Sequence, residues 1–297
     1  MKTTLVASNS RLRLGVVGTG RWGSVILREA SRVGDIDLVA AVSPSAPSKS
    51  FPIAGVEGFA DLAQAVTESG IAAVVVAVPR SESARAVACA LALGLHVLAE
   101  KPLCMLEREC DYLYAKAREV GKVLCVDYTY LFHESVQSLL PASNAERTPT
   151  LELRVNDPGR RVTPADVVWD WGPHLISLME AFGLMKSNRG EVALAVEETE
   201  LSCDAGGWTL TAHTAPGRTG RLVLQSAEIG KKRTLRLTTA GGTRTVDLLR
   251  HTATTSPVRS SLQRFTDDVR RAGEGRGLAS DENMTRAVTR ALSAAAI

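Results

Sequence analysis

The stretch LRLGVVGTGRWG, residues 12–23, joins an apolar run to a glycine-rich turn and then to a segment of helical spacing. Gly18, Gly20 and Gly23 have the G-x-G-x-x-G spacing. In such a turn the first glycine allows a tight bend, the second lets the backbone approach a pyrophosphate, and the third lets the helix pack on the strand. The N-terminus of the following helix offers free N–H groups to an anion. Because the motif lies at a strand-to-helix junction, it predicts a dinucleotide site in preference to a bare structural turn.

Apolar runs and helical patterns alternate from this turn to about residue 126. We predict strands at 12–18, 36–43, 71–79, 95–100 and 122–130, and helices at 23–33, 59–70, 82–94 and 106–121. Strands separated by helices of this length form a parallel sheet with right-handed crossovers. Residues 1–126 are therefore predicted to be an α/β, doubly wound Rossmann domain that binds NAD(P).

The pattern changes in residues 127–297, which we predict to be a second, α+β domain with a mostly antiparallel open sheet. A helix is expected at 131–143, followed by strands at 150–156, 208–215, 220–228, 233–240 and 243–250. Their period-two alternation indicates one face in water and one buried face. A closing helix at 281–297 could pack back on the first domain.

Composition excludes several classes of protein. Of the 297 residues 45% are hydrophobic and 23% charged, with a net charge of +3, which is typical of a soluble, globular protein. No apolar run is long enough to span a membrane, and the N-terminus lacks a signal-peptide pattern. We therefore expect no membrane partner.

Basic residues and cysteines are also informative. The densest basic cluster, KKR at 231–233, is more typical of a solvated hairpin end than of a phosphate-binding patch, so no nucleic-acid partner is expected. The five cysteines are odd in number and lack C-x-x-C spacing, which favours the reduced thiols of a cytoplasmic protein over disulfides or a zinc site. We expect no metal.

The predicted fourth strand, LHVLAE at 95–100, ends in charge, because Lys101 and Pro102 follow Glu100. Ligands of doubly wound sheets bind beyond the carboxyl ends of the strands. A lysine there can donate to a substrate oxygen, and Pro102 restricts its backbone to extended conformations. Spacing alone leaves a surface ion pair before a turn proline equally open.

A second conspicuous stretch is VVWDWGPHLISLMEAFG, residues 167–183. Asp170 and His174 are four residues apart and can face one another across one helical turn. A carboxylate beside an imidazole orients the ring and stabilises its protonated form, as proton transfer requires. The alternative is that Asp170 only caps the helix and His174 is a core residue.

The second predicted strand ends at Val42, where dinucleotide-binding domains often carry an acidic residue for the ribose hydroxyls. Here Ser43 follows instead. Without a carboxylate nothing repels a 2′-phosphate, and Ser43, Ser45 and Lys49 could contact one. NADP is therefore slightly favoured over NAD.

At GVVGTGRWG, VAVPR (76–80), LHVLAEKPL (95–103), VDYTYLFHESVQSL (126–139) and DVVWDWGPHLISLM (166–179), the chain resembles the glucose-fructose oxidoreductase / inositol dehydrogenase (GFO/IDH/MocA) family. The resemblance implies a substrate-binding second domain whose open sheet face forms a homodimer or homotetramer. By position, Lys101 matches the family's catalytic lysine, His174 its acid/base histidine and Asp170 the carboxylate beside it.

The resemblance also implies that Glu100 and the turn at Val78 and Pro79 line the nicotinamide half of the cofactor. Together with the glycine turn and the end of the second strand, the cofactor-binding candidates are Gly18, Thr19, Gly20, Arg21, Trp22, Ser43, Val78, Pro79 and Glu100. Tyr128 and Asn156 could face substrate hydroxyls, or could simply satisfy backbone groups. The segment around Trp169 resembles a branch of the family that acts on nucleotide sugars and sugar-like antibiotic precursors. The chain departs from the family pattern at Ser83, where a histidine is frequent, and from that branch at Leu175, where an Asp is frequent.

These observations lead to one predicted reaction: hydride transfer between C4 of a nicotinamide and a secondary alcohol or ketone of a sugar, nucleotide sugar or cyclitol. His174 would exchange the hydroxyl proton, and Lys101 would hold the same oxygen. Two alternatives remain. The scaffold could reduce an imine in a biosynthetic pathway, or it could be a non-catalytic, dinucleotide-sensing regulatory protein.

Overall fold

Two sheets organise the chain in the computed structural model, which describes residues 11–48, 51–140, 150–158, 162–185, 196–204, 207–214, 218–225, 230–251, 256–275 and 281–295. The chain divides into two compact units. The first contains Met1–Cys104, Arg108–Asp127 and Val258–Glu282, and the second contains Met105–Glu107, Tyr128–Pro257 and Asn283–Ile297. The segment 258–282, which the sequence pattern had left in the second domain, thus joins the first unit.

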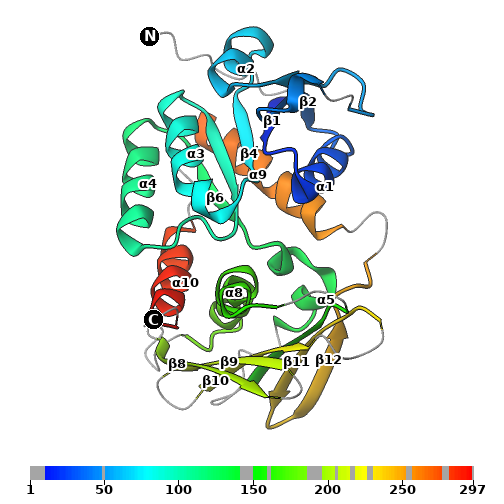
Figure 1. Ribbon diagram of the computed structural model, residues 1–297, viewed down its shortest axis with the longest axis vertical. Helices are drawn as coiled ribbons and strands as arrows, with labels where there is room; N and C mark the ends of the chain where they lie inside the picture. Colours follow the sequence, from blue (N-terminus) through cyan, green and yellow to red (C-terminus); the bar gives the residue numbers. More distant parts are fainter. Residues whose placement is uncertain are drawn as a thin grey trace. The chain divides into compact units, whose positions relative to one another are not determined.

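The sheet of the first unit is parallel and has the strand order β3-β2-β1-β4-β5-β6 (Figure 1). Its strands are β1 (Leu12–Val17), β2 (Ile36–Val42), β3 (Glu57–Phe59), β4 (Ala73–Val76), β5 (His96–Glu100) and β6 (Leu124–Asp127). The predicted doubly wound α/β sheet is confirmed. The chain changes direction across the sheet between β1 and β4, where such sheets bind ligands. The short strand β3 was not predicted from the sequence, because it has only three residues.

Helices cover both faces of this sheet (Figure 1). They are α1 (Arg21–Ala30), α2 (Leu62–Ser69), α3 (Arg80–Ala92), α4 (Glu107–Glu119) and α9 (Pro257–Gly273), with a 3-10 turn, η1 (Ala46–Ser48). In one core cluster, Leu14 of β1 is packed with Ile26 of α1 and with Leu262 and Phe265 of α9. Helix α9 therefore completes the core of a sheet that ends 130 residues earlier, at Asp127.

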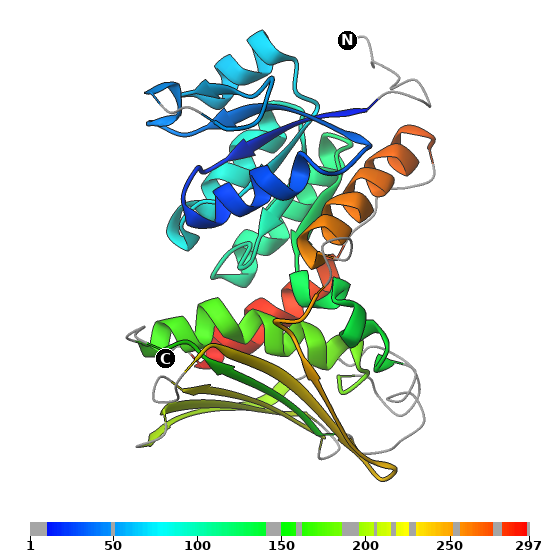
Figure 2. The same ribbon diagram turned by 90° about the vertical axis from the view of Figure 1, so that its right-hand side faces the viewer.

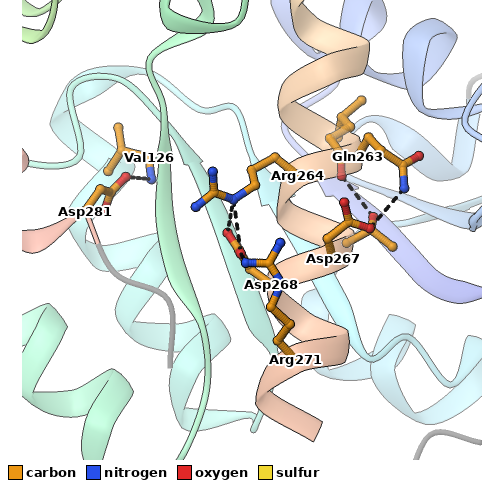
Figure 3. Close-up of polar contacts among 9 residues, drawn as sticks. Val126, Gln263, Arg264, Asp267, Asp268, Arg271 and Asp281 are labelled. Carbon is orange, nitrogen blue, oxygen red and sulfur yellow. Dashed lines mark hydrogen bonds and ion pairs between the residues drawn. The ribbon is translucent and has the colours of Figure 1, made fainter. Parts of the chain in front are cut away.

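Polar contacts also attach α9 and the residues after it to this sheet (Figure 3). Gln263 and Arg270 both donate to Asp35, which precedes β2, at 2.9 Å. Asp281 accepts a hydrogen bond from the Val126 amide at 2.6 Å and another from the Tyr114 hydroxyl. Burial raises the pKa of Asp281 to about 6. The segment is thus held by both apolar packing and specific hydrogen bonds.

The second unit is built on a mixed sheet of order β12-β11-β7-β10-β9-β8 (Figure 2). Its strands are β7 (Thr150–Asn156), β8 (Val196–Asp204), β9 (Gly207–Thr214), β10 (Arg218–Gln225), β11 (Lys232–Thr239) and β12 (Gly242–Asp247). The pair β7 and β10 is parallel, and the other pairs of described strands are antiparallel. The predicted mostly antiparallel sheet is confirmed. Strand β8 was not predicted, because its glutamates obscure the apolar alternation.

One face of this sheet is covered by α8 (Gly172–Ala181) and α10 (Glu282–Ala295), as Figure 2 shows. Leu235 and Leu237 of β11 are buried toward the helices, whereas Arg236 between them is exposed on the other face. The expected alternation of a wet and a buried face is therefore confirmed. Gly220 of β10 allows a close approach of α8, because a Cβ there would lie 2.1 Å from the Met179 sulfur.

Shorter helices precede α8. They are η2 (Thr129–Phe132), α5 (Glu134–Gln137), α7 (Pro164–Asp166) and a π-helical turn, η3 (Val167–Trp171). The predicted helix at 131–143 is wrong as a continuous element, because His133 has an extended backbone and begins α5, and residues 141–149 lie outside the described part. None of the described helices is long and apolar enough to cross a membrane.

Candidate active site

The glycine turn at the end of β1 has no room for side chains at two of its three glycines. Gly18 has φ +97°, and a Cβ there would lie 2.2 Å from the Ala77 carbonyl oxygen. A Cβ on Gly23 would lie 1.8 Å from the Gly18 carbonyl oxygen. By contrast, Gly20 is the N-cap of α1 without a side-chain cap, and a Cβ on it would meet nothing within 4 Å. The turn thus leaves open space at the start of a helix, as a pyrophosphate requires.

The end of β2 is tied to this turn. Thr19 is buried, and its hydroxyl is 2.8 Å from that of Ser43, the residue that follows the strand. Ser45 lies in the turn after it, and Lys49 lies outside the described residues. Asp37, at the opposite end of β2, pairs with Arg13 at 2.9 Å. The carboxyl end of β2 therefore presents hydroxyls where many relatives of this fold present a carboxylate.

Two carboxyl groups lie side by side at the ends of β5 and β6. The parallel register pairs Glu100 with Asp127, and the two side chains are hydrogen-bonded. Burial, together with the charge of Asp127, raises the pKa of Glu100 to about 8, although the Lys101 charge acts in the opposite direction. The indole N–H of Trp22, from the first turn of α1, donates to Glu100. A shared proton between the carboxyls is the arrangement that satisfies this geometry.

Lys101 follows β5 directly and is half-buried, and its peptide bond to Pro102 is cis. Val78 and Pro79 follow β4, and Pro79 is the N-cap of α3. The predicted cofactor residues therefore lie in the turns that follow β1, β2 and β4, in the first turn of α1 or, for Glu100, at the carboxyl end of β5. Asp127 belongs to the same edge but was missed. The predicted strand at 122–130 extended past Asp127, whereas β6 ends at this residue, so its place at the strand end was not recognised from the sequence.

In the second unit, His174 is the third residue of α8 and only 8% exposed. Its ring lies between aromatic neighbours: the Tyr130 ring centroid is 4.5 Å away and the Trp171 centroid 5.9 Å away. Asp170 lies in the π-helical turn before α8. The suggestion that Asp170 caps the helix is wrong, because the N-cap is Trp171 and no side chain caps it. The π-helical turn displaces the helix start by one residue.

An arginine completes this aromatic group. The guanidinium carbon of Arg233, at the start of β11, is 5.0 Å from the Trp171 ring centroid. One of its nitrogens donates to the Tyr130 hydroxyl at 3.4 Å. Sequence reasoning missed Tyr130, Trp171 and Arg233. For Arg233 the signal was its strand phase, since it alternates with Leu235 and Leu237.

The two predicted substrate residues have partners inside the second unit. The Tyr128 hydroxyl donates to Thr285 of α10 at 3.1 Å, and Tyr128 is 2% exposed. The Asn156 amide donates to the Gly230 carbonyl at 2.6 Å, and Asn156 is also buried. These contacts favour the alternative of internal polar contacts, and a contact with substrate stays a prediction for both residues.

The glycine turn and the parallel sheet of order β3-β2-β1-β4-β5-β6 define a dinucleotide-binding fold of the Rossmann type. Residues 12–128 match the sequence model of GFO_IDH_MocA, described as an oxidoreductase family with an NAD-binding Rossmann fold. This match covers 117 of the 297 residues, and it confirms the resemblance to the family that was seen in the sequence.

Solved structures of similar fold cover nearly the whole chain. GenD2 from gentamicin A biosynthesis, in complex with NAD, has a TM-score of 0.76 at 19% identity and covers 96% of this chain and 93% of its own. A myo-inositol dehydrogenase from Corynebacterium glutamicum has a TM-score of 0.72 at 15% identity and covers 96% of both chains. For UDP-N-acetylglucosamine 3-dehydrogenase from Acidithiobacillus ferrooxidans the TM-score is 0.74 at 18% identity, and the coverage is 95% of each chain. At these identities the likeness shows a shared fold.

One curated relative is similar in sequence over a shorter stretch. A 1-carboxy-3-chloro-3,4-dihydroxycyclohexa-1,5-diene dehydrogenase from Comamonas testosteroni is 29% identical over 130 residues, which are 42% of this chain. The match spans 32% of the length of that relative.

Proposed function

We propose that the protein is an NAD(P)-dependent oxidoreductase that interconverts a secondary alcohol and a ketone on a sugar, nucleotide sugar or cyclitol. The open space at Gly20, at the uncapped start of α1, carries the proposal, because it fits a pyrophosphate. The names of the similar proteins support the substrate class, since they include a cyclitol, a nucleotide sugar and a dihydroxylated ring.

The bound dinucleotide would supply or accept the hydride at C4 of its nicotinamide. Lys101 would donate a hydrogen bond to the reacting oxygen and stabilise negative charge that develops there. His174 would take or return the hydroxyl proton, with its ring oriented by Tyr130 and Trp171. Asp170 would favour the protonated imidazole.

Replacement of Gly20 by alanine tests the cofactor site without disturbing the fold. The new methyl group would enter open space, so we expect unchanged stability but a dissociation constant for NAD(H) and NADP(H) raised by about tenfold or more, because the methyl group occupies the place of the phosphates. Gly34→Ala is the matched control, since its Cβ also meets nothing within 4 Å. Equal binding by wild type and Gly20→Ala would contradict the proposal.

The same titrations decide between the two dinucleotides. The hydroxyls of Thr19 and Ser43 at the end of β2, in the absence of an acidic residue at 43, slightly favour NADP. We expect tighter binding of NADP(H), measured by calorimetry. Ser43→Asp should then shift the preference toward NAD(H), since a carboxylate repels a 2′-phosphate and accepts from the ribose hydroxyls.

A substrate screen tests the reaction itself. Purified protein is mixed with either dinucleotide and with sugar nucleotides, free sugars and cyclitols, and the absorbance of reduced nicotinamide is followed. His174→Asn should abolish the change with alcohols and ketones. If the variant kept much of its activity with imines only, imine reduction would replace the proposed reaction.

We also propose a cytoplasmic homo-oligomer that forms through the open face of the second sheet. That face is polar: Arg154 and Arg236 both reach Glu152, at 2.7 Å and 3.9 Å. Light scattering of the purified protein should give a mass of two or four chains, and a monomer at micromolar concentration would contradict this proposal.

A further inference from the structure

Arg233 lies on the face of its sheet that the rest of β11 uses for the hydrophobic core. It alternates with Leu235 and Leu237, which are at most 1% exposed, and in the register of the sheet it lies opposite the buried Val155. Its own side chain is half-buried. A guanidinium on the helix-covered face of a strand loses part of its hydration, and a charge that is buried in this way is normally paired with an anion.

No carboxylate compensates Arg233 in the part of the chain that the structure describes. Its contacts there are the Trp171 ring, 5.0 Å from the guanidinium carbon, and the Tyr130 hydroxyl at 3.4 Å. Both partners are neutral and leave most of the donors of the planar fork available. On the opposite face of the same strand, Arg236 reaches Glu152 at 3.9 Å.

The two lysines before Arg233 behave differently. Lys231 and Lys232 are exposed, and Lys231 is 3.6 Å from Asp157. The interpretation of the KKR cluster as a solvated hairpin end therefore holds for the lysines. Arg233 instead lies on the helix-covered face of the sheet and is half-buried, so it is not part of the solvated hairpin end.

The position of Arg233 relates it to the proposed reaction centre. Tyr130 and Trp171, the two side chains that contact Arg233, are also the two whose rings lie against His174. The guanidinium is therefore one aromatic ring away from the imidazole. A substrate whose hydroxyl reaches His174 would bring a substituent a few atoms away within reach of the guanidinium.

We propose that Arg233 is a specificity-determining residue that binds an oxyanion of the substrate, a carboxylate or a phosphate. The planar fork fits two oxygens of either group, and Trp171 stacked on one side holds the fork in one orientation. The substrate would thus be an acidic or phosphorylated polyol in place of a neutral one. This inference rests on the proposed function, which supplies the hydroxyl or ketone that reacts. The residues of the anion site, Arg233, Trp171 and Tyr130, all lie in the second unit.

Calorimetric titration of the protein saturated with reduced dinucleotide tests the proposal. The probes are D-glucuronate for a carboxylate, D-glucose 6-phosphate and UDP-N-acetylglucosamine for phosphates, and D-glucose as the neutral counterpart. We expect at least one anionic probe to bind more tightly than glucose, and Arg233→Gln to weaken it by about tenfold to a hundredfold, the usual effect of losing a charge-assisted hydrogen-bonded pair. The probe that binds distinguishes a carboxylate from a phosphate.

Two variants serve as controls. Arg233→Lys keeps the charge and most of the packing on Trp171 but loses the fork, so we expect an intermediate loss of affinity. Arg236→Gln removes a guanidinium from the opposite face of the same strand and should bind the probes as wild type does. A folded wild type that binds no anionic probe more tightly than glucose, or equal losses in both glutamine variants, would overturn the proposal.

The absorbance of reduced nicotinamide separates this inference from the proposed function. If anion binding depends on Arg233 but no probe or screened polyol changes the absorbance, the anion site stands and hydride transfer is refuted. If neutral sugars or cyclitols are turned over equally by wild type and Arg233→Gln, and no anionic probe binds more tightly than glucose, hydride transfer stands and the anion site is refuted.

Discussion

The paired carboxyls of Glu100 and Asp127 make the stability of the protein depend on pH in a way that one substitution should remove. The pKa of Glu100 is raised from an ordinary 4.5 to about 8, first by burial and then by the Asp127 charge. Between these values the folded chain holds a proton that the unfolded chain releases. The contribution of Glu100 to the free energy of unfolding is therefore fully present below about pH 4.5 and is lost as the pH rises through about 8. Glu100→Gln replaces the protonated carboxyl by a neutral amide of the same shape.

The magnitude follows from the linkage relation. One proton held only in the folded state lowers the free energy of unfolding by ~1.4 kcal/mol per pH unit. From about pH 5.5 to about pH 7.5 the full effect is ~3 kcal/mol. Because Glu100 is half-buried and shares its charge with Asp127, we expect about 1–3 kcal/mol.

Urea unfolding of wild type and Glu100→Gln across this pH range measures the effect. The free energy of the variant should exceed that of wild type by an amount that widens as the pH rises. Other shifted groups, such as Asp281 with a pKa of about 6 and His96 with a pKa of about 4, are common to both proteins and cancel in the difference. Glu119→Gln, on the exposed side of α4, is the control. A pH-independent difference, or one that narrows, would refute the shared proton.

Three further substitutions follow from the packing. Gly18→Ala should lower the free energy of unfolding in urea by about 3 kcal/mol or more, because its Cβ would lie 2.2 Å from a backbone carbonyl oxygen. Gly55→Ala, at φ +81° but in open space, is the control and should cost only about 1 kcal/mol. Asp281→Asn weakens the acceptor for the Val126 amide, and a loss of about 1–3 kcal/mol at neutral pH is expected; an unchanged urea midpoint would contradict it. Gly172→Ala puts a methyl group 2.6 Å from a Leu292 methyl and should lower the free energy of unfolding by about 1–3 kcal/mol, which is measured as a lower Tm. A Tm equal to that of wild type would show that Leu292 of α10 moves aside without cost.

The first unit was largely predictable from sequence because its signals are local. Continuous apolar strands such as 73–76, a glycine turn and helices ended by glycine each specify an element within a few residues. Helix α9 was overlooked although Val258, Leu262, Phe265 and Val269 have helical spacing. What no local signal could supply was its partner, since its apolar side packs on strands more than a hundred residues earlier.

In the candidate site, too, some residues were predictable from local sequence and others were not. Gly18, Gly20 and Lys101 follow from motif and strand position. The contact of Arg233 with Trp171 and the pairing of Glu100 with Asp127 depend on register between separate strands and helices, which spacing along the chain does not specify. The π-helical turn before His174 is a further example, because nothing in VVWDWG distinguishes it from an ordinary helix start.

The contribution of α9 to the core around β1 has a consequence for biosynthesis. A ribosome releases residues 12–127 long before Val258, Leu262 and Phe265 emerge. Until then the nascent nucleotide-binding half presents an uncovered apolar stripe beside Leu14 and Ile26. Its final closure is therefore a late event that waits for nearly the entire polypeptide, and a shortened gene product that stops after β6 should be captured by chaperones or precipitate.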